Sequence, residues 1–178
     1  MAGNPGVQEF WSRCREALPG LPEELPDAWA FGATRDQADE LLELVLDGTK
    51  TGTASALWDY EHSGDALPAV GGYSIILDGR TAPRALIETT SVDVVAFGEV
   101  SGAHARAEGE GDRSPSTWRE IHERFWRNHS ENPVANDHGG SFLAAARAAR
   151  ACPREAGRGS GGQRTYSNRW NWLRSVPS

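Results

Sequence analysis

The sequence has a single lysine, Lys50, although it contains 18 basic residues, so the other 17 are arginine. Both residue types bear a positive charge on a long stem, but only lysine is a compact ammonium that loses its proton when its surroundings lower its pKa. One lysine can fall anywhere by chance. Its place in the segment "DGTKTGT" nevertheless makes Lys50 the first candidate for a functional residue.

Cysteine and long apolar runs are also scarce. The two cysteines, Cys14 and Cys152, have no metal-ligand spacing and indicate no disulfide framework, which favours a reducing compartment. No stretch approaches the ~18 apolar residues of a membrane span. The segment "MAGNPGVQEFW" lacks the basic flank and apolar run of a signal peptide. We therefore expect a cytoplasmic protein that does not act at a membrane.

The net charge of −7 is unevenly distributed. Residues 1–133 hold 11 basic and 23 acidic residues, whereas residues 134–178 hold 7 arginines against Asp137 and Glu155. An acidic body argues against broad, sequence-independent binding of nucleic acid, because such binding rests on neutralising phosphates. A small cationic pocket is still compatible with this charge. The C-terminal arginines could contact phosphates or simply be solvated.

Hydrophobic periodicity and turn residues predict an α+β fold. Helices are expected over residues 7–18, 34–48 and 114–128, with a short helix within 101–112 and two or three strands, one hairpin included, over 73–97. The helix at 34–48 has the best end signals, with Thr34 as cap, Gln37 three residues later and Gly48 at its end. Residues 142–152 are compatible with a helix, and residues 153–168 have the composition of a flexible linker.

The segment Lys50-Thr51-Gly52-Thr53 is the first candidate site. It is not a phosphate-binding P-loop, because it lacks the upstream glycines and follows a helix instead of preceding one. Side chains alternate along an extended segment, so Lys50 and Thr53 would face opposite sides unless the chain bends. The alternative interpretation is a helix end, where a cation is favourable, followed by an ordinary strand.

The acidic loop "AEGEGDRS" is the second candidate. Glu108, Glu110 and Asp112 alternate with glycines, which allow tight turns and close backbone approach. Three carboxylates in one loop could bind a divalent cation or supply a general acid or base. A solvated acidic loop explains the pattern equally well.

Aromatic residues near these motifs form the third group. Rings can stack on a flipped-out or single-stranded base, but core packing is the better explanation for most of them. The group comprises Trp58, Tyr60, Trp118, Phe125 and Trp126. The five histidines show no metal-ligand spacing. His122 lies on the predicted buried face of its helix, which favours a structural role.

Several segments stand in an order that is similar to one known family. They are "WAFG", "ADELLELVLDGTKTGTAS", "LPAVGGYSIILDG", "ALIETTSVDVVAF", "HARAEGEGDRS" and "WREIHERFW". Over about residues 28–127 the chain resembles ASCH-domain proteins, which are similar to PUA-fold RNA-binding domains. The resemblance implies a PUA-like small β-barrel with surrounding helices.

We accordingly assign residues 1–133 to an ASCH domain with an N-terminal helix. Residues 134–178 form an atypical, arginine- and glycine-rich C-terminal segment, partly flexible and without an assigned structure. A final hydrophobic strand is expected to close the barrel, but no such pattern follows Pro133.

The resemblance also implies a function related to nucleic acids. Some ASCH proteins are amidohydrolases that remove acyl groups from N4-acetylated cytidine, others are reported as ribonucleases, and others bind nucleic acid. By position, the amidohydrolase set corresponds to Lys50, Thr53 and Glu110, with Glu108 as the alternative glutamate. The candidate substrate-binding residues are Thr51, Tyr60, Glu108, Ser114 and Trp118. The expected partner is a modified nucleoside or single-stranded RNA, and the oligomeric state is not assigned.

A hydrolase mechanism explains the lone lysine. Thr53 would attack the acyl carbonyl, a neutral Lys50 would take its proton, and Glu110 would pass a proton to the leaving amine. The base role requires the pKa of Lys50 to be lowered toward ~7–8. No cofactor is expected for this reaction. The alternatives are a ribonuclease, for which a divalent cation at Glu108, Glu110 and Asp112 is an option, and a non-catalytic RNA-binding module.

Overall fold

The computed structural model describes residues 5–129 and 141–150. The helices are α1 (Pro5–Ala17), α2 (Arg35–Leu46), α3 (Leu57–Ser63), the 3₁₀ turn η1 (Phe97–Glu99), α4 (Gly102–Glu108) and α5 (Pro115–His129). The strands are β1 (Ala28–Trp29), β2 (Gly52–Ala56), β3 (Tyr73–Leu77), β4 (Pro83–Ala96) and β5 (Ser141–Arg150). Within the described residues no helix is both long and apolar enough to span a bilayer.

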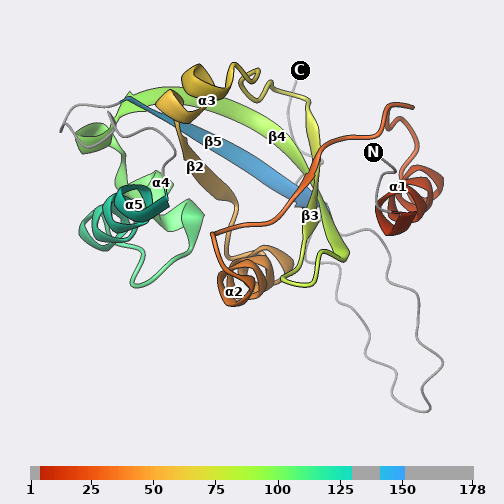
Figure 1. The fold of residues 1–178 in the computed structure, drawn as a ribbon, viewed down its shortest axis with the longest axis horizontal. Helices are drawn as coiled ribbons and strands as arrows, with labels where there is room; N and C mark the ends of the chain where they lie inside the picture. The colour runs from red at the N-terminus through yellow and green to blue at the C-terminus, as the bar shows by residue number, and fades with distance from the viewer. Residues whose placement is uncertain (1–4, 130–140, 151–178) are drawn as a thin grey trace, which may run out of the picture.

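The strands form one curved sheet in the order β1-β3-β4-β5-β2 (Figure 1). The hairpin β3–β4 and the pairs β4–β5 and β5–β2 are antiparallel, whereas β1 runs parallel to β3. The long strand β4 joins the two halves, since it pairs with β3 and with β5. The mixed α+β class is therefore confirmed. The small closed barrel is not, because β1 and β2 remain the two edges of the described sheet.

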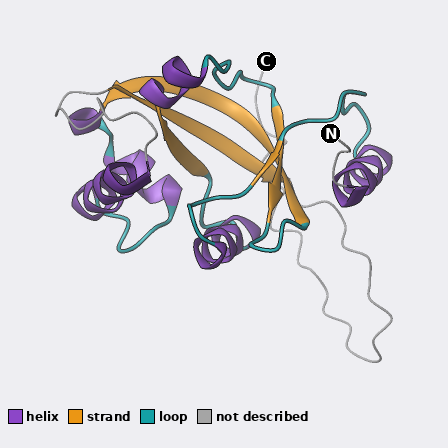
Figure 2. Cartoon of the chain, in the orientation of Figure 1, coloured by secondary structure: helices purple, strands orange, loops and turns teal. Residues whose placement is uncertain are grey.

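Helices cover the sheet on different sides (Figure 2). Helix α1 lies near the β3 end, α4 and α5 lie together at the opposite end, and α2 lies beneath the middle of the sheet. Alternation along the strands explains how two helices pack on β3 and β4 from opposite faces. Ile75 and Leu86 contact α1, whereas Ile76 and Ile87 contact α2.

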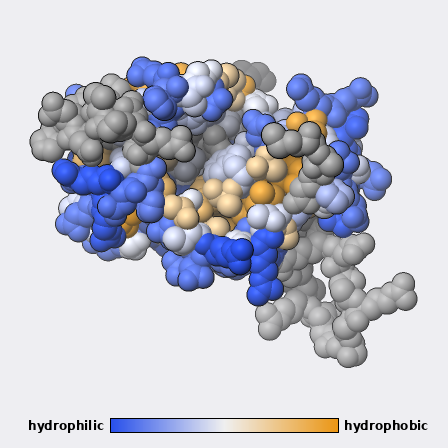
Figure 3. Space-filling model, in the orientation of Figure 1, coloured by the Kyte–Doolittle hydropathy of each residue, from blue (hydrophilic) through white to orange (hydrophobic). Residues whose placement is uncertain are grey.

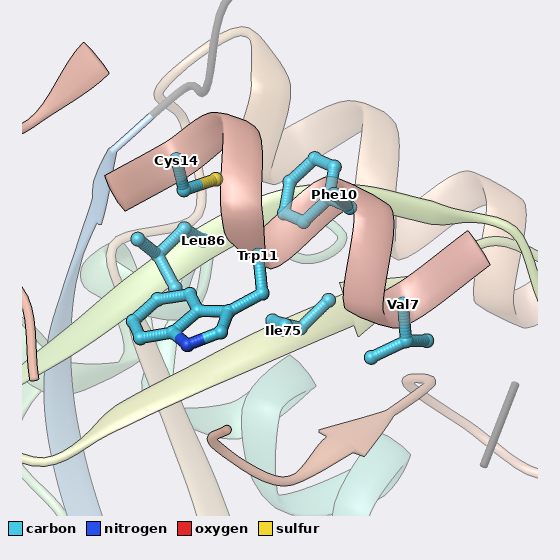
Figure 4. Packing of buried hydrophobic residues seen from close by; sticks show 6 residues of the cluster. All are labelled: Val7, Phe10, Trp11, Cys14, Ile75 and Leu86. Atoms are coloured by element: carbon cyan, nitrogen blue, oxygen red, sulfur yellow. The ribbon is translucent and has the colours of Figure 1, made fainter. Parts of the chain in front are cut away.

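The apolar face predicted for the first helix is the one that packs in the core. Figure 4 shows Val7, Phe10, Trp11 and Cys14 directed from α1 toward Ile75 and Leu86. Each large apolar side chain buried in this way contributes ~1.5–3 kcal/mol. Cys14 is fully buried and disulfide-bonded, although the two cysteines of the sequence indicate no disulfide framework. The other cysteine, Cys152, lies outside the described residues.

A third apolar cluster holds the helical end of the molecule together. Ala105 from α4 and Trp118 and Trp126 from α5 pack against Ala56 of β2 and Val100. Burial of these two tryptophans confirms the core interpretation for them. The cluster fixes the positions of α4 and α5, and so of the acidic loop between them.

Two elements differ from the expectations. Helix α3 is not evident in the sequence, and residues 142–152, expected to be compatible with a helix, instead contain strand β5. Alanine favours a helix locally, but the facing edges of β4 and β2 each offer unpaired backbone groups, and β5 pairs with both. The sheet thus continues past residue 133. The linker predicted at residues 153–168 lies outside the described residues.

Candidate active site

The end of α2 directs Lys50 into the interior. Thr34 caps the start of the helix, where its hydroxyl accepts a hydrogen bond from the N–H of Gln37 at 3.2 Å. The helix ends in a left-handed turn at Gly48, with φ at 82°. The N–H of Lys50 then donates to the carbonyl of Leu44 at 2.8 Å, which keeps the chain close to the helix end.

The late start of β2 removes the geometric problem posed by strand alternation, because Lys50 and Thr51 lie outside the strand. The N–H of Thr51 donates to the carbonyl of Ala107 in α4 at 2.7 Å, and β2 begins only at Gly52. Lys50 therefore precedes the strand, and alternation does not separate it from Thr53. Both side chains line the same cavity.

Three oxygens surround the Lys50 ammonium. Its Nζ atom lies 2.7 Å from Oε2 of Glu108, 2.8 Å from Oε1 of Glu110 and 3.3 Å from the backbone carbonyl of Glu108. The Phe31 ring lies 5.5 Å away on another side. Only 2% of the Lys50 side chain is exposed. An ammonium has three donors, and this arrangement gives each of them an acceptor.

The charge state of Lys50 differs from the one expected. Burial alone would lower the pKa of Lys50, but the charges of Glu108 and Glu110 and their hydrogen bonds outweigh it, so its pKa is raised above the usual value. The resting residue is an ammonium. A lowered pKa, which the role of general base requires, is therefore wrong for this resting state.

Glu108 is a fixed anion behind the lysine. Its Oε1 atom accepts hydrogen bonds from Nε2 of His104 at 2.9 Å and from the indole N–H of Trp118 at 3.1 Å. Burial alone would raise the pKa of Glu108, but the charge of Lys50 and the hydrogen bond from His104 hold it well below its usual range. With 1% of its side chain exposed, Glu108 is far less accessible than Glu110, and a direct role of Glu108 in substrate binding stays a prediction.

Glu110 has a different environment, in the loop between α4 and α5. Its side chain is 17% exposed and lines the cavity, so it is the more accessible of the two acids. Gly109 and Gly111 flank it with φ of 76° and 55°. A Cβ at Gly109 would lie 3.0 Å from the carbonyl oxygen of Thr49, so glycine lets the loop approach the lysine segment closely.

The cavity has a volume of about 430 Å³, within the usual range for small-molecule sites. Its polar lining includes Lys50, Thr53, Glu108, Glu110 and His122, and Arg124 also contributes to the wall. Its apolar lining includes Phe31, Leu41, Ile121, Phe125 and Trp126. Figure 3 shows the face of the molecule that is turned toward the viewer in Figure 1. Less hydrophilic residues lie in the middle of that face, where the chain runs from β1 to α2, and hydrophilic residues surround them.

A second cavity of about 720 Å³ adjoins the first and shares Phe31, Thr53 and Phe125 with it. Tyr60 lines this second cavity and not the first. Thr51 contributes to neither of the two.

The other predicted site residues lie outside the cavity walls. Trp118 is 2% exposed and acts on the site through its bond to Glu108. The hydroxyl of Ser114 accepts from the N–H of Thr117 at 3.2 Å and so caps α5. For Ser114 and Trp118, a direct role in substrate binding stays a prediction.

The three acidic residues proposed to bind a divalent cation, Glu108, Glu110 and Asp112, do not all lie together in the structure. The Asp112 carboxylate is exposed and accepts from the N–H of Ser114 at 2.9 Å. Glu108 and Glu110 instead approach His122, with one ligand atom of each within 4.8 Å of the others. Since both carboxylates already hold the Lys50 ammonium, a cation would have to share them with it.

Sequence reasoning gave no functional role to the two histidines of this network, of which His122 was interpreted as structural. His104 precedes Glu108 by four residues on α4, and His122 follows Trp118 by four residues on α5. The i, i+4 spacing places such pairs on one helix face and was the available signal.

Comparisons with known proteins agree with this architecture. A family model described as ASCH domain matches residues 27–144. The crystal structure of protein EF3133 from Enterococcus faecalis V583 is 31% identical over 82% of this chain and 88% of that chain, with a TM-score of 0.74. An ASCH domain from Lactobacillus crispatus is 24% identical over 84% of this chain and 97% of that chain, also at 0.74. No curated protein matches the chain.

Proposed function

The chain belongs to the ASCH-domain family, and on that basis we propose that it is a hydrolase of a small modified nucleoside. The reaction is removal of an acyl group from an exocyclic amine, as in N4-acetylcytidine. The observation that supports it most is the pair of Lys50 and Glu110, joined at 2.8 Å in a cavity that also exposes Thr53. One cavity then contains a nucleophile, Thr53, a residue that carries protons, Glu110, and a fixed cation, Lys50.

The raised pKa of Lys50 reassigns the roles. Glu110, the accessible carboxylate, takes the proton of the Thr53 hydroxyl, and the oxygen attacks the acyl carbonyl carbon. Once Glu110 has taken this proton it carries no charge, so the Lys50 donor that faced it can turn to the carbonyl oxygen and stabilise the negative charge that develops there. Glu110 returns the proton to the nitrogen as the C–N bond breaks and its electron pair goes to nitrogen. Water, deprotonated by Glu110, then cleaves the threonyl ester and releases a carboxylic acid.

This assignment gives a different reason for the lone lysine. The ammonium is a compact centre with three donors, and the three oxygens at 2.7, 2.8 and 3.3 Å match it. A guanidinium is longer and planar and presents its donors as a fork. Shape therefore selects lysine over arginine here, rather than the ability to lose a proton.

The charge pattern weighs against a phosphate-binding module. All three donors of Lys50 already have acceptors within the protein, and Glu108 and Glu110 bring two negative charges to the same place. A phosphate at Lys50 would have to approach against those charges, so the other cation of the wall, Arg124, would have to bind it instead. A neutral nucleoside meets no such barrier.

The test is turnover of N4-acetylcytidine by the purified protein, with cytidine and acetate measured by chromatography. We expect conversion by the native chain and a loss of at least ~10²-fold in Thr53→Val, which removes the hydroxyl and keeps the shape. Single-stranded RNA is assayed in parallel for cleavage and for binding at two salt concentrations. RNA cleavage without nucleoside turnover would mean a ribonuclease. Strongly salt-dependent RNA binding without either reaction would mean a binding module.

A further inference from the structure

The orientation of the His122 ring is fixed by the helix on which it lies. Its Nδ1 atom is 2.9 Å from the backbone carbonyl of Trp118, one turn earlier in α5. A carbonyl oxygen only accepts, so Nδ1 must hold a hydrogen and donate it. The neutral imidazole then has its lone pair on Nε2.

That second nitrogen has no hydrogen bond with any of the described residues. It lies 3.5 Å from Oε1 of Glu108. The same oxygen already accepts hydrogen bonds from His104 and Trp118, which use its lone pairs. His122 lines the cavity beside Glu110, so in the neutral ring this nitrogen is an acceptor that a ligand in the cavity can approach.

The ring is held rigidly as well as oriented. It stacks on Trp118 with ring centroids 4.2 Å apart and an interplanar angle of 20°. Trp126 packs on it at 5.1 Å. Only 8% of His122 is exposed. In the neutral ring, an acceptor fixed in this way can discriminate between ligand groups, because the ring cannot rotate to exchange its two nitrogens.

Two acceptors therefore lie on the same wall of the cavity. One carboxylate oxygen of Glu110 and a ring nitrogen of His122 are within 4.8 Å of each other. A single nitrogen bearing two hydrogens can bridge a gap of this size, with one hydrogen bond to each. A carbonyl oxygen in the same place would have acceptors on both sides and no donor.

We infer that His122 and Glu110 together recognise the exocyclic amine of the nucleoside by accepting its hydrogen bonds. His122 is the positioning and specificity-determining residue. This inference rests on the proposed function. In the acylated substrate the nitrogen has one hydrogen, with which it donates a hydrogen bond to the ring nitrogen of His122. The nitrogen lone pair that forms in the tetrahedral intermediate then faces Glu110. Glu110 donates the proton as the C–N bond breaks, and the product amine is held by both acceptors.

The test compares the binding of cytidine and uridine by calorimetry, since the two differ in an amine donor against a carbonyl acceptor. We expect the native protein to bind cytidine at least ~10-fold more tightly than uridine, as one lost buried hydrogen bond implies. His122→Asn keeps a donor for the Trp118 carbonyl but removes the outer acceptor, and should reduce the preference below ~3-fold. His122→Gln can place an oxygen near the former Nε2 and should restore part of it.

His122→Phe keeps the stacking on Trp118. It replaces His122→Asn in the binding comparison if circular dichroism shows that His122→Asn does not fold. A native protein that binds neither nucleoside, or that shows no preference, would overturn the inference. The inference would also be overturned if a folded His122→Asn or His122→Phe variant kept the full preference for cytidine over uridine. Hydrolysis of N4-acetylcytidine is measured in parallel. A cytidine preference that depends on His122, without hydrolysis, would support this inference and contradict the proposed reaction.

Discussion

The Nζ atom of Lys50 lies 2.7 Å from Oε2 of Glu108, although 58 residues separate the two in the chain. Their side chains are 2% and 1% exposed, so solvent screens the pair very little. Removing one partner of a buried ion pair is costly, because the remaining charge is left without compensation. The contact therefore joins the end of α2 to the end of α4 and fixes these two walls of the cavity relative to each other.

Glu108→Gln should destabilise the protein by ~3 kcal/mol at neutral pH, the low end for breaking a buried pair, because Lys50 keeps Glu110. The pKa of Glu108 is lowered from its usual 4.5, so its stabilising effect is present above that pH and is lost as the pH falls below it. Urea unfolding should thus show the gap between native and variant proteins narrowing from pH 5 to pH 3.

Glu123→Gln is the matched control, since it removes a carboxylate from an exposed pair with Arg127, in which both side chains are 50% exposed. It should change stability by no more than ~0.5 kcal/mol. Equal losses in the two variants would mean that the buried pair is not a stabilising contact.

If the native protein hydrolyses N4-acetylcytidine, deprotonation of Lys50 should cause no increase in its rate between about pH 8 and 10. Because the pKa of Lys50 is raised above 10.5, the residue is an ammonium throughout this range. A steep increase in kcat with pH up to 10 would restore Lys50 as the general base. Lys50→Arg should lose at least ~10²-fold in kcat, because a guanidinium does not fit the three oxygens.

Glu110→Gln should retain the fold and lose activity. An amide oxygen can still accept from Lys50, so we expect a stability change below ~1.5 kcal/mol. The loss of a positioned proton carrier should lower kcat by ~10²–10⁴-fold. Thermal unfolding and turnover of N4-acetylcytidine measure the two effects. Asp112→Asn, in the same loop but with its carboxylate in solvent, should stay active, and a comparable loss there would point to the loop as a whole.

Gly109→Ala should affect stability and turnover together. The residue has φ of 76°, and a Cβ would meet the side chain of Thr49 at 2.8 Å and its carbonyl oxygen at 3.0 Å. Gly64→Ala is its control, since Gly64 has φ of 73° but nothing within 4 Å of the added Cβ. The control should lose ~1–2 kcal/mol from backbone strain alone. Gly109→Ala should lose more and should also lower kcat, whereas identical behaviour would show that close packing of the loop is unimportant.

Local signals allowed much of the fold to be predicted. Capping by Thr34 and the apolar spacing of α1 are properties of neighbouring residues, so the sequence alone indicates them. Strand β5 is different, because its alanines favour a helix and only the pairing with two distant strands makes it extended. Helix propensity is weak enough for such tertiary pairing to override it.

The contact between two of the predicted residues could be anticipated from the sequence better than the electrostatics of the candidate site could. Lys50 and Glu110 were identified from their motifs, and the structure joins them directly. The sign of the pKa shift of Lys50 was not predictable, because it depends on the balance between burial and two carboxylates that come from another element. His122 was interpreted as structural, and its free nitrogen is visible only once its partners are known.

The position of β5 sets the order in which the site can be completed during synthesis. Among the described strands, β5 is the one that pairs with β2, which bears Thr53. The ribosome makes it last of all the described elements. A nascent chain can bring Lys50 and Glu108 together once α4 has emerged, but β2 has no strand to pair with until about residue 150 is free of the exit tunnel. Thr53 is thus the last residue of the candidate site to be fixed in place, and a prematurely terminated chain would have Lys50 in position but Thr53 on an unpaired strand.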